Sequence, residues 1–160
     1  MILKGTDNTR GIGLLETLWK VVEALIDTRL RTSLQMHNAL HRFRSGRGTG
    51  MAIIELKLAQ KLSRIYQDPL FLEFLDLRKS YDTLDRDRLI KTLEGYVTGP
   101  RMCGLLETFW DCQQMVPRQN GFHGLAFPAT RGTMQWGIVS PTLFNMVVES
   151  VIRTWLSMTL

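Results

Sequence analysis

Cysteine is scarce in this sequence. The 160 residues include two, Cys103 and Cys112, and neither stands in the close pairs of Cys and His that zinc sites use. The pattern therefore argues against a disulfide framework and against a zinc site, and we expect both residues to be free thiols.

Long apolar runs are also missing. No uninterrupted run approaches the roughly 20 residues that a membrane-spanning helix needs, and the start of the chain, Met1 to Asp7, lacks the apolar core of a signal peptide. With 5 Pro and 13 Gly the chain is neither collagen-like nor of low complexity. We therefore expect one soluble, intracellular domain with no membrane partner.

Acidic residues are absent from one long stretch of an otherwise mixed sequence. The whole chain has 20 Lys and Arg against 15 Asp and Glu, a formal charge of +5, but no acidic residue falls between Thr28 and Ile54. The basic residues of this stretch are Arg29, Arg31, Arg42, Arg44 and Arg47, with His37 and His41. A phosphate-binding surface and a solvated helix face followed by a basic loop are equally good interpretations of this feature alone.

Apolar residues at intervals of three and four predict several amphipathic helices. They cover about 14–30, 51–65, 86–96, 102–110 and 140–155. In the first helix, Glu23 and Asp27 fall mostly off the apolar stripe, whereas in the second the apolar residues from 53 to 65 mark a buried side. In the last helix, Ser140 suits the N-cap and Pro141 the first helical position.

Two segments predict strands rather than helices. Asn120-Gly121 is a strong hairpin signal between two short apolar segments. The segment 70–77 is short and almost entirely apolar, which suits a strand buried on both faces. Helices and strands that do not alternate regularly indicate the α+β class, with helices packed on a small, mostly antiparallel sheet.

The one carboxylate near the end of the expected strand is that of Asp76. A carboxylate at the end of a buried strand must be paired, protonated or bound to a cation to offset its desolvation. A structural salt bridge and a magnesium site are equally good interpretations of Asp76 by itself.

Four motifs in order resemble those of reverse transcriptases. FLDLRKSYDTLDRDRL (74–89) is similar to the first catalytic motif, and GTMQWGIVSPTLFN (132–145) to the Gln-Gly-x-x-x-Ser-Pro motif. Upstream, KGTDNTRGIGLL (4–15) and HNALHRFRSGRGTGMAI (37–53) resemble two fingers segments. The style is that of the enzymes of non-LTR retrotransposons and group II introns.

The resemblance implies a right-hand polymerase with catalytic Mg²⁺ or Mn²⁺. Asp76 would be the metal-binding carboxylate, the Leu77 carbonyl a second metal contact, and Tyr81 the aromatic that screens the sugar 2′ position of the incoming nucleotide. Lys4 and Arg10 would contact the triphosphate, Arg10 more directly.

The same resemblance implies further contacts with substrates. Gln135 would lie against the incoming deoxynucleoside triphosphate. The residues expected near the RNA template are Arg44, Gly46, Arg47, Ser140 and Pro141. The implied partners are thus an RNA template, a DNA primer and deoxynucleoside triphosphates.

The chain departs from the family pattern in two places. Trp136 stands where the family has Gly, and the sequence has no Tyr-x-Asp-Asp hairpin with further catalytic carboxylates. We expect residues 1–68 to be fingers-like and 69–160 palm-like with a fingers insertion, without that hairpin or a thumb. The expected function is templated DNA synthesis on RNA by a two-metal mechanism, which we expect this chain alone to lack; the alternative is a non-catalytic RNA-binding remnant.

Overall fold

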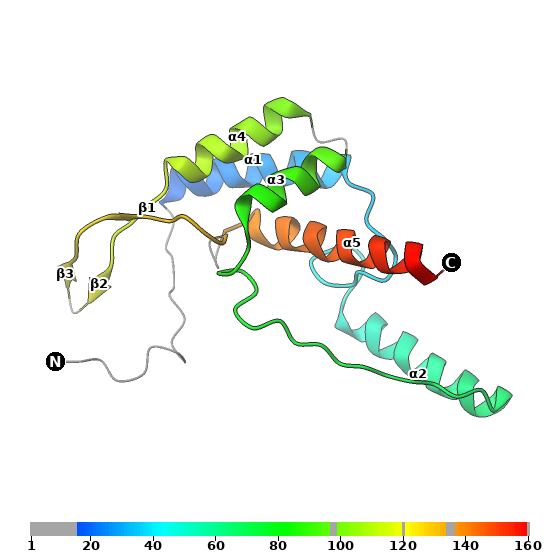
Figure 1. Ribbon diagram of the computed structural model, residues 1–160. Coiled ribbons are helices and arrows are strands. Elements are labelled where there is room, and N and C mark those ends of the chain that lie inside the picture. The colour runs from blue at the N-terminus through cyan, green and yellow to red at the C-terminus, as the bar shows by residue number, and fades with distance from the viewer. Residues whose placement is uncertain (1–15, 97–98, 120, 134–136, 160) are drawn as a thin grey trace.

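The computed structural model describes residues 16–96, 99–119, 121–133 and 137–159. Four helices form the body of the molecule: α1 (Thr17–Ser33), α3 (Arg86–Gly95), α4 (Pro100–Asp111) and α5 (Ser140–Thr159). A further helix, α2 (Thr49–Tyr66), projects from this body (Figure 1). The helices expected from the apolar periodicity are confirmed, with ends that differ by a few residues.

The hydrophobic core lies between helices. α5 contacts both α1 and α3, and α3 contacts α4. The most deeply buried side chains include Leu93, Leu106 and Leu143, each fully inaccessible to solvent. Such burial of apolar area is the main driving force for packing the four helices. The core is therefore built by helix-on-helix packing and not, as expected, by helices on a sheet.

The strands in the described residues form a hairpin that projects beyond the end of α4. β1 (Gln114–Met115) pairs antiparallel with β4 (Phe127–Pro128), and β2 (Arg118–Gln119) with β3 (Phe122–His123). Gly121 at the turn has a φ of 84°, a conformation that glycine adopts without steric cost. The hairpin expected at Asn120-Gly121 is confirmed, and helices with short antiparallel strands are compatible with the α+β class.

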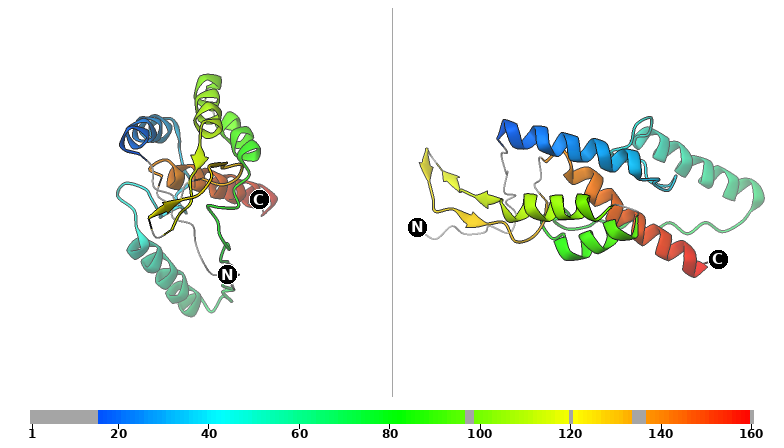
Figure 2. Two further views of the ribbon diagram at one scale, coloured as in Figure 1. Left: turned by 90° about the vertical axis from the view of Figure 1, so that its left-hand side faces the viewer. Right: turned by 90° about the horizontal axis from the view of Figure 1, so that it is seen from above.

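The second helix and the segment after it form an arm at the opposite end of the molecule from the hairpin (Figure 2). No residue of α2 is buried, so the buried side expected for this helix is wrong. The buried strand expected at 70–77 is also wrong: the segment is extended, and Phe71 and Leu75 are 90% and 83% exposed. Within the described residues no strand pairs with it, and an unpaired extended segment gains little burial.

The structure also bears on the two cysteines and on the expected lack of a membrane-spanning helix. Cys103 is buried and Cys112 exposed, and no disulfide joins either of them to a described residue. In the described part of the chain, no helix has the length and apolar character needed to cross a membrane.

Candidate functional site

Two motifs that lie far apart in the sequence meet at Tyr81. The backbone N–H of Thr133 donates to the Tyr81 carbonyl at 2.9 Å, and that of Gly132 to the Leu84 carbonyl at 2.8 Å. Gly132 has a φ of 77°, and a Cβ at this position would lie 2.7 Å from the Tyr81 carbonyl oxygen. Only glycine allows this crossing of the two backbones.

The Tyr81 side chain lies between this crossing and α5. Its ring centroid is 5.3 Å from that of Phe144, with a tilt of 42° between the rings. Burial raises the pKa of the Tyr81 hydroxyl, while the positive charge of Arg42 opposes this shift. The first motif, the start of α5 and the basic loop before α2 therefore converge around one half-buried tyrosine.

Two buried carboxylates of α1 hold the start of α5. Glu23 is 1% exposed and its Oε2 accepts a 2.6 Å hydrogen bond from the backbone N–H of Ile138. One helical turn later, Asp27 accepts a hydrogen bond from the Thr142 hydroxyl and pairs with Arg31 at 2.6 Å. The expectation that Glu23 and Asp27 lie off the buried face is wrong, because negative groups are stabilised at a helix N-terminus.

The Ser-Pro pair begins α5 in this environment. Ser140 is 1% exposed, and Pro141 is half-buried. A Cβ on Gly137 would meet the Ser140 hydroxyl at 2.7 Å and the Glu23 carboxylate at 2.9 Å. The close approach of these groups therefore also favours glycine at position 137. Ser140 is enclosed by α1 and by the loop that precedes α5.

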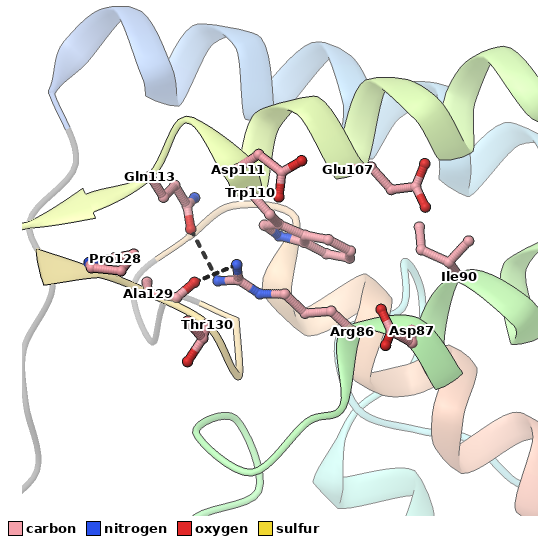
Figure 3. A pocket seen from close by; sticks show the side chains of 10 residues that line it. All are labelled: Arg86, Asp87, Ile90, Glu107, Trp110, Asp111, Gln113, Pro128, Ala129 and Thr130. Atoms are coloured by element: carbon pink, nitrogen blue, oxygen red, sulfur yellow. Dashed lines mark hydrogen bonds between the residues drawn. The ribbon is translucent and has the colours of Figure 1, made fainter.

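Arg86 is a functional candidate that the sequence reasoning missed. Its guanidinium donates to the carbonyls of Ala129 at 2.5 Å and Gly132 at 2.9 Å, and to the Gln113 Oε1 at 3.3 Å (Figure 3). Its Cζ lies 5.3 Å from the centroid of the Trp110 ring. Burial lowers the Arg86 pKa. No sequence signal marked this residue, because its acceptors, two backbone carbonyls and the Gln113 side chain, are distant along the chain.

A cavity of about 450 Å³ opens beside Arg86. Its lining includes the carboxylates of Asp87, Glu107 and Asp111 (Figure 3). An acidic lining repels phosphate groups, so this cavity does not suit the nucleotide or template contacts that the sequence predicts.

The arginines expected near the template stabilise their own loop. Arg44 donates to the carbonyls of His37 at 2.6 Å and Leu40 at 3.1 Å. Arg47 donates to the carbonyl and the side-chain oxygen of Asn38, at 2.5 and 2.8 Å. Gly46 has a φ of 71°. Because these acceptors are neutral, the loop keeps its positive charge, and a template contact by Arg44, Gly46 and Arg47 stays a prediction.

The predicted metal ligands are Asp76 and Leu77, which are exposed and lie on the extended segment before Tyr81. Among the described residues, no group of three or more His, Cys, Asp or Glu side chains could hold a metal ion. Mg²⁺ binds through carboxylates, water and substrate phosphates in octahedral geometry. The described residues therefore supply one carboxylate at the expected place and do not by themselves form a two-metal site.

Several predicted contacts lie outside the described residues. These are Lys4, Arg10 and Gln135, together with the unusual Trp136. On either side of the undescribed residues 134–136, the Thr133 N–H donates to the Tyr81 carbonyl, and a Cβ added to Gly137 would lie 2.9 Å from the Glu23 carboxylate.

Two proteins of transposable elements are similar to this chain in sequence. The chain is 28% identical over 146 residues to the transposon TX1 uncharacterized 149 kDa protein of Xenopus laevis, covering 89% of this chain and 11% of that protein. It is 22% identical over 151 residues to the retrovirus-related Pol polyprotein from type-2 retrotransposable element R2DM of Drosophila melanogaster, covering 94% of this chain and 14% of the polyprotein.

The chain thus spans a small part of the length of both relatives. The model of the family described as reverse transcriptase (RNA-dependent DNA polymerase) matches residues 2–159. Since this match covers nearly the whole sequence, the chain belongs to the reverse transcriptase family.

Proposed function

We propose that this chain forms the fingers and palm of an RNA-directed DNA polymerase, with residues 1–68 in the fingers and 69–160 in the palm with a fingers insertion. The observation that carries the proposal is the junction at Tyr81, where the first motif, the Gly132-Thr133 crossing and α5 meet. Motifs that only resemble a family by chance would have no reason to touch one another.

In this proposal Tyr81 lies beneath the sugar of the incoming deoxynucleoside triphosphate. Burial raises the pKa of the phenol further above its ordinary value of 10.0, so the ring is uncharged and acts through its shape. Gln135 contacts the nucleotide, and Lys4 and Arg10 contact its phosphates. A guanidinium suits the second role because its planar donors match phosphate oxygens in pairs.

The proposed template is RNA paired with a DNA primer, as in copying of a retroelement. The relatives' printed names support this, since both describe proteins of transposable elements and one describes a Pol polyprotein. The basic residues of the loop before α2, together with Ser140-Pro141, are proposed to face the template. We also propose that the protein acts inside the cell.

Polymerisation in this family depends on divalent metal ions, for which Asp76 would supply one ligand. The described residues lack the further carboxylates that two ions require. We therefore propose that the 160-residue chain does not extend a primer by itself. Its remaining capacity is to bind nucleic acid.

Fluorescence anisotropy with a labelled RNA template and DNA primer tests the binding. We expect weak binding at about 50 mM salt, and log affinity falling with log salt by about 0.7–0.9 for each phosphate neutralised. Absence of binding at the low salt concentration, or affinity independent of salt, contradicts the proposal. Magnesium-dependent extension that Asp76→Ala abolishes contradicts the proposed inactivity but supports the polymerase fold.

A non-catalytic RNA-binding remnant is the second candidate. The observation that favours it is that the described residues contain no group of three or more side chains able to hold a metal ion. To distinguish the two, a segment with a Tyr-x-Asp-Asp hairpin is fused after Leu160, and Trp136→Gly is made in the fusion. Primer extension by this fusion, lost on Asp76→Ala, supports a polymerase palm. RNA binding without extension in every combination supports the remnant.

A further inference from the structure

The loop before α2 presents an exposed aromatic ring from a backbone conformation that side chains rarely adopt. Phe43 has a φ of 56° and is 37% exposed. The Cζ of Arg42 lies 4.7 Å from the centroid of the Phe43 ring, so a guanidinium covers part of the ring. Non-glycine residues with positive φ are uncommon, and in bulky residues they indicate strain or function.

Hydrogen bonds from three separate segments fix this conformation. Arg31 of α1 donates to the Phe43 carbonyl at 2.9 Å, and Asn145 of α5 donates to the Arg42 carbonyl at 2.8 Å. Arg44 holds the preceding turn through the carbonyls of His37 and Leu40. A strained residue persists only where its surroundings over-determine it, so the exposure of the Phe43 ring is built into the fold.

Arginines flank the ring in the sequence, and the carboxylates of Asp27 and Glu55 pair with Arg31 and His41. Phe43 stands between Arg42 and Arg44, in the stretch from Thr28 to Ile54 that contains no acidic residue. The charge of Arg42 also acts on the hydroxyl of Tyr81. The ring therefore lies in the same basic region that borders the Tyr81 junction.

We propose that Phe43 is a stacking platform for one unpaired base of single-stranded nucleic acid, with Arg42 and Arg44 attracting the adjacent phosphates. Proteins that bind single strands combine aromatic rings with a positively charged groove, because every base has a π-face and every linkage a charge. This inference rests on the proposed function for the identity of the partner. It assigns contact with a base to Phe43, a residue to which the resemblance to reverse transcriptases gave no role.

The substitution Phe43→Gly separates stacking from folding. Glycine adopts a positive φ without steric cost, so the variant should keep the backbone of the loop, which circular dichroism and thermal unfolding verify before binding is measured. Because stacking of one base on an aromatic ring contributes substantially, we expect its affinity for single-stranded RNA to fall by about 5- to 100-fold. Phe43→Trp should keep the affinity, because it keeps a ring.

The measurement uses a short single-stranded RNA that carries one 2-aminopurine, whose fluorescence is quenched by stacking, titrated over a range of salt concentrations. Phe43→Gly should lose both affinity and quenching at an unchanged salt slope. Arg42→Ala should lower the salt slope by about 1. The control is Phe122→Ala, since Phe122 is 80% exposed on the hairpin at the other end of the molecule (Figure 2).

Failure of this inference can be distinguished from failure of the proposed function. If the wild type binds RNA with a steep salt dependence and Phe43→Gly binds and quenches equally well, the stacking platform is wrong and the proposed function stands. If the wild type does not bind single-stranded or primed RNA at low salt, both are wrong. A loss of affinity in Phe122→Ala equal to that in Phe43→Gly also overturns the platform.

Discussion

The carboxylate of Glu23 accepts a 2.6 Å hydrogen bond from the backbone N–H of Ile138, a residue 115 positions away in the sequence. The bond joins α1 to the turn from which α5 begins. Burial raises the pKa of Glu23, and hydrogen bonds from the N–H groups of Ile138 and Val139 partly oppose this shift. Together with Asp27, Glu23 therefore fixes the start of α5, the helix that carries Phe144.

Removal of this acceptor should destabilise the protein. Glu23→Ala leaves buried N–H groups without a partner, so we expect the free energy of unfolding to fall by about 1–3 kcal/mol. Urea denaturation followed by circular dichroism measures the change. Glu16→Ala is the control, because Glu16 is exposed at the start of the same helix; an equal loss in both variants would contradict the role of Glu23.

The charge of Glu23 should also set a pH dependence. Because its pKa is higher in the folded protein than the ordinary 4.5, the protonated form is favoured by folding. The resulting stabilisation is complete below pH 4.5 and is lost as the pH rises through the raised pKa. Glu23→Gln lacks this loss, so its stability relative to the wild type should increase between about pH 4 and pH 7. A constant difference across this range would contradict the prediction.

Gly132 should tolerate a methyl group less well than another glycine of similar backbone conformation. Gly121→Ala is the matched variant, since Gly121 has a φ of 84° and nothing within 4 Å of an added Cβ. We expect Gly121→Ala to cost about 1–2 kcal/mol, the cost of a left-handed conformation. Gly132→Ala should cost more, because its Cβ would also meet the Tyr81 carbonyl. Equal melting temperatures for the two variants would contradict this.

Arg86 should not be replaceable by lysine. Its planar guanidinium reaches three acceptors at once, whereas an ammonium group cannot reproduce that geometry. We expect Arg86→Lys to accelerate amide hydrogen exchange at Gly132 and Thr133 and to lower stability by about 1–3 kcal/mol. Arg88→Lys, at an exposed position of the same helix, should leave that exchange unchanged, and exchange at wild-type rates in Arg86→Lys would contradict the prediction.

The stability of the core between α3, α4 and α5 should depend on Leu106 and not on its neighbour Leu105. Leu106 is fully buried, while Leu105 is 40% exposed. Leu106→Ala should lower the free energy of unfolding by about 2–5 kcal/mol, and Leu105→Ala by about 0.5 kcal/mol or less. Comparable losses would mean that α4 packs by a different face.

Local patterns predicted most of the secondary structure correctly. The five helices expected from the apolar spacing all form in the described residues, and α5 begins at the Ser140-Pro141 pair. The hairpin at Gly121 follows from a dipeptide. These features depend on residues a few positions apart, so they can be deduced without knowledge of the fold.

Sequence patterns predict burial wrongly where burial depends on residues that are distant along the chain. An apolar segment such as 70–77 predicts a buried strand, but no strand of the described residues pairs with it, and its side chains stay exposed. Conversely, the apolar spacing of α1 predicts that Glu23 and Asp27 lie mostly off its buried face. They are buried because α5 supplies N–H and hydroxyl donors at that place.

Local residue patterns are enough to predict the helices and the hairpin. They also reveal the basic stretch and the order of motifs that indicates a reverse transcriptase. Other features depend on tertiary structure. These are the contacts of Tyr81 with Thr133 and Phe144, the hydrogen bonds from Arg86 to the backbone before α5, and the exposure of Phe43. The physical reason is the range of the interactions. Helical and turn hydrogen bonds link near neighbours, whereas a buried charge or an exposed ring is defined by residues that folding brings from elsewhere in the chain.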